Sequence, residues 1–478
     1  MKKKFKTFGA GMICLLFVFS CSTNDMTQSL RTDFSNEKVE IVANPYVITE
    51  ANAIDIAFEY TDNKIESIET EGRLTIRSSV SDVGGTDNRR STVTSKNFSV
   101  RIEELSSDVL EVKQEVTVYT INFQEENGKN AGFVVMVGDE RVSGKILIFS
   151  EDEYTSFEMD IRPDADFLED IIAGYLYKSI NIDEFNHPMT TRGGWLNTSI
   201  VPGDSSYNLG PIVYNFAHNV TPFNNYTPFR GSPAKRSSGG CTAVAMSEIM
   251  AWHEWPEIGV FPRYNSNTPT PDTVSVSYIL TSQQRLNLQK QNYSDATVAA
   301  YVANLIIETG YRLNTNYAVD VSLAFPDDVP FVFEEMGFTA DSISDYNYAD
   351  IEYDIINRVL PVFMAGWKHS LDTAYGGHAY VIDGIRRISN NNFVDKYIAL
   401  IEGNTTNGVY YDPEGNCAIW FNEKMFTTDK DSSSYVQQPG EILYPYRYGC
   451  RIIKNIKRNP YKNGSNNPNW YRNNKKPY

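Results

Sequence analysis

The spacing of apolar and polar positions in the first half of the chain predicts a helix, then a sheet, then a second helix. From Thr49, a candidate N-cap, the sequence TEANAIDIAFEY places apolar side chains at helical spacing. The runs NFSVRI, EVTVYTINF, GFVVMV and KILIFS are rich in β-branched and aromatic residues and predict strands. Residues 80–96, rich in Gly, Ser, Thr and Arg, predict a loop, and residues 163–179 predict an amphipathic helix. We expect a small α+β unit over residues 45–190.

The second half shows the same two kinds of pattern in a larger unit, which we expect over residues 195–456. Within residues 237–256, apolar side chains recur at helical spacing until a proline ends the pattern. In the stretch YGGHAYVIDGI, apolar residues alternate as in a core strand that we expect to end at Asp383-Gly384. The basic, asparagine-rich stretch 457–478 has no core-forming periodicity and predicts a disordered tail.

Composition narrows the class of protein. The chain has 478 residues, 41% of them hydrophobic, which is too long for one ordinary domain and too apolar for a disordered or fibrous protein. A net charge of −17 offers no basic face of the kind that a nucleic-acid-binding protein needs. Beyond residue 20 no apolar run reaches the ~18–20 residues that span a bilayer. We therefore expect a large, acidic, multi-domain globular protein without a nucleic-acid partner.

Residues 1–21 resemble a bacterial lipoprotein signal. Four lysines precede an apolar stretch, and Ser20 stands before Cys21, the lipobox cysteine that lipidation would modify. We expect export and a lipid anchor at the bacterial cell envelope or surface, with release after later processing, and no membrane contact other than the anchor. Phe19 stands where the motif prefers a small residue, so ordinary secretion with cleavage nearby stays an alternative.

The number of cysteines indicates a free thiol. Cys14 leaves with the signal and Cys21 is used by the anchor, which leaves Cys241, Cys417 and Cys450. An odd number of cysteines in an exported protein indicates at least one unpaired thiol. The odd count does not show which of the three cysteines is unpaired. The residues around each cysteine are therefore needed to identify a reactive thiol.

Cys241 has the surroundings of a reactive thiol. It follows Gly239-Gly240, which permit a tight turn, and it begins the predicted helix. Unpaired N–H groups and the helix dipole favour an anion at a helix N-terminus, and this lowers the pKa of a thiol. The alternative is a buried and inert structural cysteine.

His378 is the candidate base. It follows Gly376-Gly377 at the start of the predicted strand and lies 137 residues after Cys241. Papain-like thiol proteases separate these two residue types by ~130–150 residues, with the cysteine on a helix of one subdomain and the histidine on the sheet of the other. A histidine at a strand start is often only packed or capped, but its pairing with Cys241 favours the catalytic interpretation.

Both segments resemble the streptopain-like cysteine peptidases. The family pattern G-C-x-A-x-A is present at residues 240–245, and G-G-H-A-F-V-I-D-G is nearly complete at residues 376–384. The resemblance implies a papain-like α+β fold and an endopeptidase that hydrolyses protein or peptide substrates with a Cys241 thiolate and His378. The segment IMAWHEWP looks like the family's I-M-x-x-H-x-x-P helix end, which assigns His253 to the scaffold.

The resemblance extends into the first half. Residues 51–58, 119–123 and 132–141 look like the helix and strands, including G-F-V-I-V-S-G-D-x-R, of a streptopain-inhibitor-type pro-domain as in gut-bacterial lipoproteins. This implies that residues 45–190 form an intramolecular inhibitor that occludes the cleft until it is removed, so that the chain is a zymogen. Arg192 is then a candidate cleavage site, although a plain interdomain linker fits the stretch PMTTRGG equally well.

Two departures from the family pattern concern the groups that support catalysis. The N-W-G-W-G-G stretch after the histidine strand is absent, which leaves Asn404 as the best candidate for orienting His378 and Glu402 as its competitor. Lys235 stands where papain-like enzymes often carry an oxyanion-hole Gln. The backbone N–H of Cys241 remains as one donor, and loss of a second costs ~10²–10³ in rate.

These departures leave two alternatives open. One is a catalytically weak or inactive surface lipoprotein that uses the peptidase fold for binding. The other is a transglutaminase-like acyl transferase, which also uses Cys and His. The five histidines are scattered and neither HExxH nor CxxC occurs, so we expect no metal and no other cofactor.

Overall fold

The computed structural model describes most of the chain after the predicted signal. The predicted signal and lipobox, the stretch around Arg192, and the segment with Asn404 and Glu402 lie outside the described residues. The described residues are 38–61, 65–69, 75–79, 90–106, 110–124, 128–142, 144–150, 156–158, 165–181, 207–209, 216, 220–264, 272–289, 292–368, 377–389, 394–401, 419–426 and 448–459.

The first half forms helices and strands close to where the pattern predicts them. Helix α1 (Glu50–Thr61) follows Thr49, whose hydroxyl accepts a hydrogen bond from the Asn52 N–H (3.3 Å), as expected of an N-cap. The four predicted strands and the second helix are also present. The elements of this half are β1 (Lys38–Val42), α1, β2 (Ile65–Glu69), β3 (Thr75–Ser79), β4 (Arg90–Arg101), η1 (Glu103–Leu105), β5 (Leu110–Gln124), β6 (Asn130–Val137), β7 (Ile146–Ser150) and α2 (Ala165–Asn181).

The predicted loop at residues 80–96 is wrong in its second part. Residues 90–96 belong to β4, which pairs antiparallel with β5 from Arg90 opposite Gln124 to Arg101 opposite Lys113. Strand preference depends on the partner as much as on composition. Pairing with the 15-residue strand β5 therefore outweighs the loop-like composition of this stretch.

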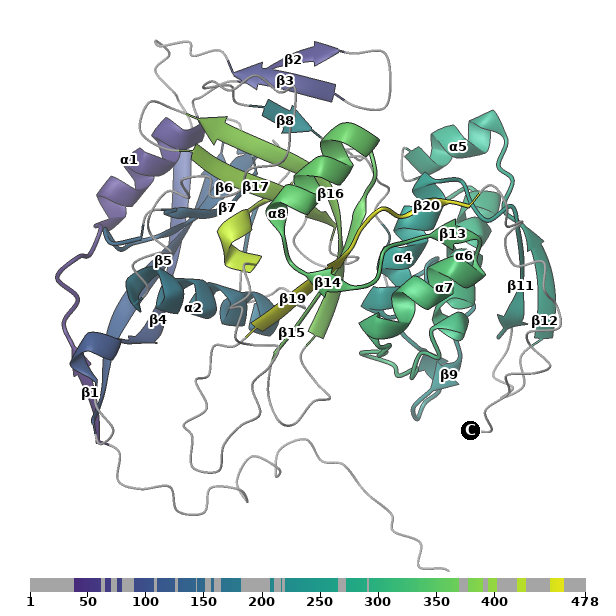
Figure 1. Ribbon diagram of the computed structural model, residues 1–478, viewed down its shortest axis with the longest axis horizontal. Coiled ribbons are helices and arrows are strands. Elements are labelled where there is room, and N and C mark those ends of the chain that lie inside the picture. Colours follow the sequence, from purple (N-terminus) through teal and green to yellow (C-terminus); the bar gives the residue numbers. More distant parts are fainter. Residues whose placement is uncertain are drawn as a thin grey trace, which may run out of the picture.

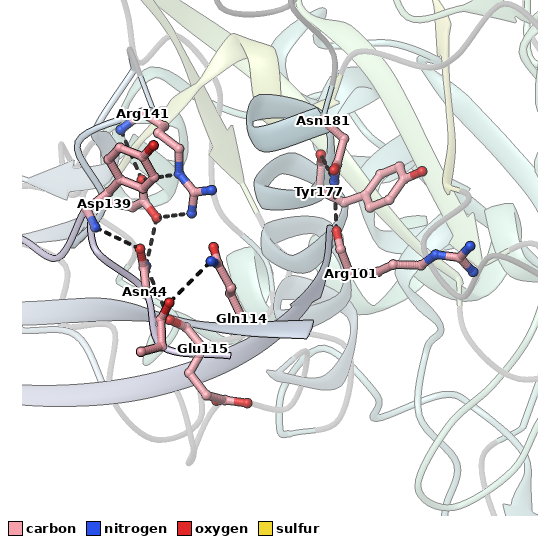
Figure 2. Close-up of polar contacts among 10 residues, drawn as sticks. Asn44, Arg101, Gln114, Glu115, Asp139, Arg141, Tyr177 and Asn181 are labelled. Atoms are coloured by element: carbon pink, nitrogen blue, oxygen red, sulfur yellow. Dashed lines mark hydrogen bonds and ion pairs between the residues drawn. The ribbon is translucent and has the colours of Figure 1, made fainter. Parts of the chain in front are cut away.

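A buried acid holds the turn after β6 (Figure 2). Asp139 accepts hydrogen bonds from the Arg141 guanidinium (2.6 and 3.0 Å) and from the Asn44 amide (2.9 Å). Burial raises the pKa of Asp139, but these donors outweigh burial and the pKa is lowered. At the end of α2, the Asn181 amide donates to the Arg101 carbonyl (2.8 Å) and ties the helix to β4.

The second half supplies a layer of helices and the remaining strands. Helix α4 (Cys241–Trp252) begins at the predicted position, and its residues 242–251 are all buried. No helix among the described ranges is both long and apolar enough to cross a membrane. The other elements are β8 (Tyr207–Leu209), β9 (Phe229–Arg230), β10 (Lys235–Arg236), β11 (Ile258–Arg263), β12 (Asp272–Ser277), α5 (Ser282–Gln289), α6 (Ala296–Arg312), η3 (Pro326–Asp328), α7 (Val329–Glu335), β13 (Phe338–Thr339), β14 (Ser344–Asp345), α8 (Tyr348–Tyr353), η4 (Asp354–Arg358), β15 (Val362–Lys368), β16 (Gly377–Ser389), β17 (Val394–Ile401), β18 (Trp420–Asn422), η5 (Glu423–Phe426), β19 (Tyr448–Ile453) and β20 (Lys457–Arg458).

Strands from both halves of the chain form one sheet. Hydrogen-bonded neighbours follow the order β1-β5-β6-β7-β18-β17-β16-β15-β19-β14, so β7 of the first half pairs with β18 of the second. Figure 1 shows α1, α2 and β4 to β7 of the first half, purple to blue, at one end of this arrangement and helices α4 to α7 at the other. The α+β fold class predicted from the sequence is confirmed.

Successive side chains of the central strands point alternately into two hydrophobic cores, one on each face of the sheet. In β15, Val362 and Met364 join the core that contains α2, whereas Phe363 and Ala365 join the core around α4. Successive residues of a strand point to opposite faces of a sheet. Helix α2 from the first half and helix α4 from the second therefore cover opposite faces of the same strands.

The expected end of the strand after His378 is wrong. Strand β16 continues to Ser389 instead of ending at Asp383-Gly384. A β-bulge between Ile382 and Gly384 shifts the register while pairing with β17 goes on. An Asp-Gly pair that looks like a turn in the sequence is here a bulge inside a long strand.

The C-terminal boundary also differs from the expectation. Lys457 and Arg458, expected in the disordered tail, form β20 and pair with β13, and the adjacent Ile456 is fully buried. Residues 460–478 lie outside the described part of the chain. The other unit boundaries, 45–190 and 195–456, stay predictions.

Candidate active site

A tight turn places Cys241 at the first position of α4. Gly240 has φ 86°, in the left-handed region, and a Cβ atom there would lie 3.1 Å from the Ser322 carbonyl oxygen. Glycine is therefore needed for both backbone conformation and space. The Val244 N–H donates to the Gly240 carbonyl (3.0 Å), which starts the helix. The N–H of Cys241 lies in the first turn and so has no acceptor within the helix.

Buried hydrogen bonds fix the turn that precedes α4. The Ser238 N–H donates to the Ala318 carbonyl (3.0 Å), and the Ser322 hydroxyl donates to the Ser238 carbonyl (2.7 Å). From another segment, the Thr227 hydroxyl donates to the Ser237 carbonyl (2.6 Å). The position of the candidate nucleophile is therefore set by contacts with two separate parts of the chain.

His378 is the second residue of β16 and pairs with Gly366 of β15. Its ring packs edge-on against Tyr380, with the ring centroids 4.6 Å apart. Helix α4 packs against β16 (Figure 1), and this packing brings His378 into hydrogen-bonding contact with the Cys241 thiol. The structure thus brings together the two residues that the sequence separates by 137 positions.

The surroundings of Cys241 favour its thiolate. Burial by itself raises the pKa of the thiol, but the charge and hydrogen bond of His378 lower it, as do the Ala379 backbone and the Thr242 side chain beside it. The resulting pKa is about 7. A large fraction of the thiol is therefore ionised at neutral pH. In contrast, burial raises the pKa of Cys450 in β19 to about 12.

The predicted supporting residues are placed only in part. Asn404 and Glu402 lie outside the described residues, so the group that orients His378 stays a prediction. Lys235, at the position where an oxyanion-hole Gln is frequent, lies exposed on β10. The N–H groups at the N-terminus of α4 are the oxyanion donors that the described residues offer beside the thiol.

His253 lies where the resemblance to the peptidase family places it, in the scaffold. It is the C-cap of α4, at the opposite end of the helix from Cys241. Its Nε2 lies 2.9 Å from the Ile456 carbonyl oxygen, and its ring packs against Phe338 with the centroids 5.4 Å apart. These contacts tie the end of α4 to the C-terminal segment.

The sequence did not reveal a buried pair of acids between α4 and β16. Glu248 is fully buried, and its Oε1 accepts a hydrogen bond from the Phe216 N–H (2.7 Å). Burial raises the pKa of Glu248 well above its usual range, the Phe216 N–H opposes this, and the nearby Asp383 raises the pKa further. In the sequence, Asp383-Gly384 looked like a turn, so Asp383 was not expected in the core. The sequence signal for the buried pair was Glu248, an acidic residue in a helix of mostly apolar residues.

The arrangement suits attack on a carbonyl carbon. A partly ionised thiol lies beside an imidazole, and N–H groups of a helix N-terminus lie next to the thiol. These are the groups that nucleophilic catalysis of acyl transfer needs: a nucleophile, a proton donor and acceptor, and oxyanion donors. Within the described ranges, no three His, Cys, Asp or Glu side chains are grouped so that they would hold a metal ion.

Residues 218–402, which contain both Cys241 and His378, match the family described as the Peptidase C10 family. No curated protein matches the chain. Among solved structures, the chain is similar to active wild-type interpain A cysteine protease from Prevotella intermedia, with 16% identity and a TM-score of 0.32. That match covers 52% of this chain and 94% of the other.

Proposed function

We propose that the chain is a cysteine-type endopeptidase of the streptopain kind in which Cys241 and His378 form the catalytic pair of an exported zymogen. The match of residues 218–402 to the Peptidase C10 family supports this. The same match agrees with the resemblance to the streptopain-like peptidases, whereas the pro-domain and the lipoprotein signal stay predictions. The observation that carries the proposed pair is the contact between His378 and a Cys241 thiol whose pKa is lowered to about 7.

In the proposed reaction, the Cys241 thiolate attacks the carbonyl carbon of a peptide bond while the Cys241 N–H donates to the developing oxyanion. Protonated His378 gives its proton to the leaving amine, the C–N bond breaks, and a thioester remains on Cys241. Neutral His378 then takes a proton from a water molecule that attacks the thioester. Release of the carboxylic acid product restores the thiolate. We keep Asn404 as the residue that orients His378, with Glu402 as its competitor.

The regulatory part of the proposal is supported by the N-terminal motifs. Residues 132–141 carry the pattern of a streptopain-inhibitor-type pro-domain, and residues 1–21 carry that of a lipoprotein signal. We propose that the unit at residues 45–190 keeps the enzyme latent and that cleavage after it, with Arg192 as candidate site, activates it. The enzyme acts on proteins or peptides outside the cytoplasm and contacts the membrane through its lipid anchor alone.

Covalent labelling tests the catalytic pair. The chain from residue 22 onward, without lipid, is incubated with an epoxysuccinyl thiol-protease probe under reducing conditions and followed by intact mass. We expect one probe per molecule on the wild type and on a Cys450→Ala control, and none on Cys241→Ala. Self-cleavage between residues 178 and 194, absent in Cys241→Ala, would support the zymogen. Labelling without self-cleavage would mean that another protease matures the chain.

The same experiment addresses the two alternatives. No labelling of Cys241 in a folded chain, even after cleavage at Arg192, would contradict the catalytic pair and favour a binding protein that retains the peptidase fold. Labelling together with incorporation of a primary amine into glutamine-bearing proteins, and with no cleavage of peptide bonds, would favour the acyl transferase.

A further inference from the structure

The interface between α4 and β16 carries two sets of polar side chains. One set is Cys241 and His378, at the N-terminus of the helix. The other is the pair of buried acids, Glu248 on α4 and Asp383 on β16. Glu248 follows Cys241 by two helical turns, about 10 Å along the helix axis. The elements that carry the candidate nucleophile and base therefore also meet at an acid pair.

Both acids lie inside an apolar core. Glu248 is fully buried and Asp383 is 1% exposed. Ala379 and Val381 of β16 belong to the core around α4, and Asp383 continues this alternate series of side chains. Asp383 is also the extra residue of the β-bulge between Ile382 and Gly384. Bulges re-aim a side chain, and this one brings a carboxyl group to a face that is otherwise apolar.

Only one oxygen of Glu248 has a donor. Its Oε1 accepts a hydrogen bond from the Phe216 N–H (2.7 Å). Its Oε2 is buried and has no hydrogen-bond partner among the described residues. An ionised carboxylate accepts hydrogen bonds at both oxygens, so a charged Glu248 would leave buried lone pairs without donors. A protonated Glu248 avoids this cost, because its second oxygen then carries hydrogen and no net charge.

The charges around α4 do not favour a second negative charge on the pair. Other charged side chains of the elements packed against α4 have partners elsewhere: Glu308 and Glu335 with Arg312, and Arg386 with the rings of Phe149 and Trp420. The charge that acts on Glu248 is that of Asp383, and it opposes ionisation of Glu248. Two carboxylates that share a buried site do not both ionise readily, and they titrate as a pair.

We propose that Glu248 and Asp383 hold one proton between them and so keep α4 against β16. They act as positioning residues: the singly charged pair holds the Cys241 thiol in contact with His378. This rests on the proposed function in that the thiol and imidazole are taken as the reacting groups. When the proton is lost at alkaline pH, two buried carboxylates repel each other across the interface. Helix α4 and β16 then move apart, and the reaction slows.

Infrared spectroscopy tests the shared proton without any need for activity. In the folded chain from residue 22, at neutral pH, we expect a carbonyl band of a protonated carboxylic acid that is absent from Glu248→Gln. The matched control is Ser247→Ala, at the buried neighbour whose hydroxyl donates to the Ala243 carbonyl (2.7 Å) and the Thr309 hydroxyl (3.2 Å). This variant should keep the band. Identical spectra for the wild type and Glu248→Gln would overturn the proposal.

The pH dependence of labelling at Cys241 by the epoxysuccinyl probe tests the positioning role. The labelling rate of each variant is divided by the wild-type rate at the same pH, so that titration of the thiol and imidazole is common to both. Gln imitates the protonated acid and has no proton to lose. The ratio for Glu248→Gln should therefore rise about tenfold between about pH 6 and 9. The ratio for Ser247→Ala should stay constant, as a purely structural role would also predict for Glu248→Gln.

A double variant tests whether the two acids act as one unit. Asp383→Asn removes the other charge, so its ratio should rise with pH as that of Glu248→Gln does. Glu248→Gln combined with Asp383→Asn should rise no further, because either change removes the same repulsion. Ratios that multiply in the double variant would contradict a shared proton. If Glu248→Gln does not fold by circular dichroism, Asp383→Asn gives the same infrared and labelling comparisons.

Failure of this inference is distinguishable from failure of the proposed function. Wild-type labelling at Cys241 with a constant ratio for Glu248→Gln would support the catalytic pair and overturn the positioning role. Absence of labelling in every form would count against the catalytic pair. The infrared comparison would then still decide whether Glu248 and Asp383 share a proton.

Discussion

Cys241 and Cys450 carry the same side chain, yet the pKa of one thiol is lowered to about 7 and that of the other is raised to about 12. Burial raises the pKa at both sites. Only Cys241 has the charge of His378 and hydrogen-bond donors from Ala379 and Thr242 around its sulfur, and these stabilise the anion. The sequence predicted that Cys241 lies at a helix N-terminus. It did not show whether burial, which raises the thiol pKa, or the contacts that stabilise the thiolate would dominate.

His378→Ala tests the source of the lowered thiol pKa. The substitution removes the positive charge and the hydrogen bond but leaves Cys241 partly buried, so we expect the pKa of Cys241 to rise. The rate of alkylation by iodoacetamide at neutral pH should fall about tenfold or more, and its pH midpoint should move upward. His253→Ala, at the other end of α4, should leave the midpoint in place. An unchanged profile in His378→Ala would contradict the ion pair.

Glu248→Gln tests the buried acid. Glu248 has an ordinary pKa of 4.5, and burial beside Asp383 raises its pKa in the folded protein. As the pH rises above 4.5, the unfolded chain loses this proton first, so the folded protein binds more protons and its stability declines with pH. Gln keeps an acceptor for the Phe216 N–H and has no proton to lose. The stability of Glu248→Gln relative to the wild type should therefore increase with pH.

Urea unfolding at about pH 4, 6 and 8 measures this effect on stability. The control is Glu104→Gln in η1, an exposed acid. Its stability relative to the wild type should be nearly constant over the same range. A constant difference between Glu248→Gln and the wild type would show that Glu248 titrates alike in the folded and unfolded protein.

At the scale of elements, spacing within about ten residues predicted α1, α2, α4 and strands β4 to β7 because helices and strands differ in the period of their apolar positions. Three predictions failed where pairing with another strand decided the outcome. Residues 90–96 form a strand on β5, β16 continues through a bulge at Asp383-Gly384 on β17, and Lys457 and Arg458 pair with β13. Composition near a residue does not reveal which strand will lie beside it.

The turn before α4 is the element on which the site depends, and Gly240→Ala tests it. Gly240 combines φ 86° with a Cβ position 3.1 Å from the Ser322 carbonyl oxygen. Backbone strain alone costs about 1–3 kcal/mol in the free energy of unfolding, and we expect a larger loss than this, with slower probe labelling, because the added Cβ also forces α4 to shift. Gly128→Ala is the matched control, since it has φ 83° with no atom within 4 Å. Equal losses and unchanged labelling in both variants would contradict the packing role.

At the scale of the whole molecule, the two halves share their sheet and their cores, so we expect them to unfold together. Phe149→Ala removes the ring at the junction and should lower the free energy of unfolding by about 3–5 kcal/mol within a single transition. Phe331→Ala on α7, 56% exposed, should change stability by less than about 0.5 kcal/mol. Circular dichroism and tryptophan fluorescence during urea unfolding measure this. Two separate transitions would show that the halves are independent.

The sequence by itself determined the local elements, the fold class and the two residues of the candidate pair, because spacing, turn residues and a family motif lie within short stretches. Only the tertiary structure decided that His378 contacts the Cys241 thiol, that Glu248 is buried beside Asp383, and that β7 continues the catalytic sheet through β18. Each of these contacts joins residues from separate elements. Their formation depends on how α4, β16 and β18 pack, and packing is a property of the folded chain as a whole.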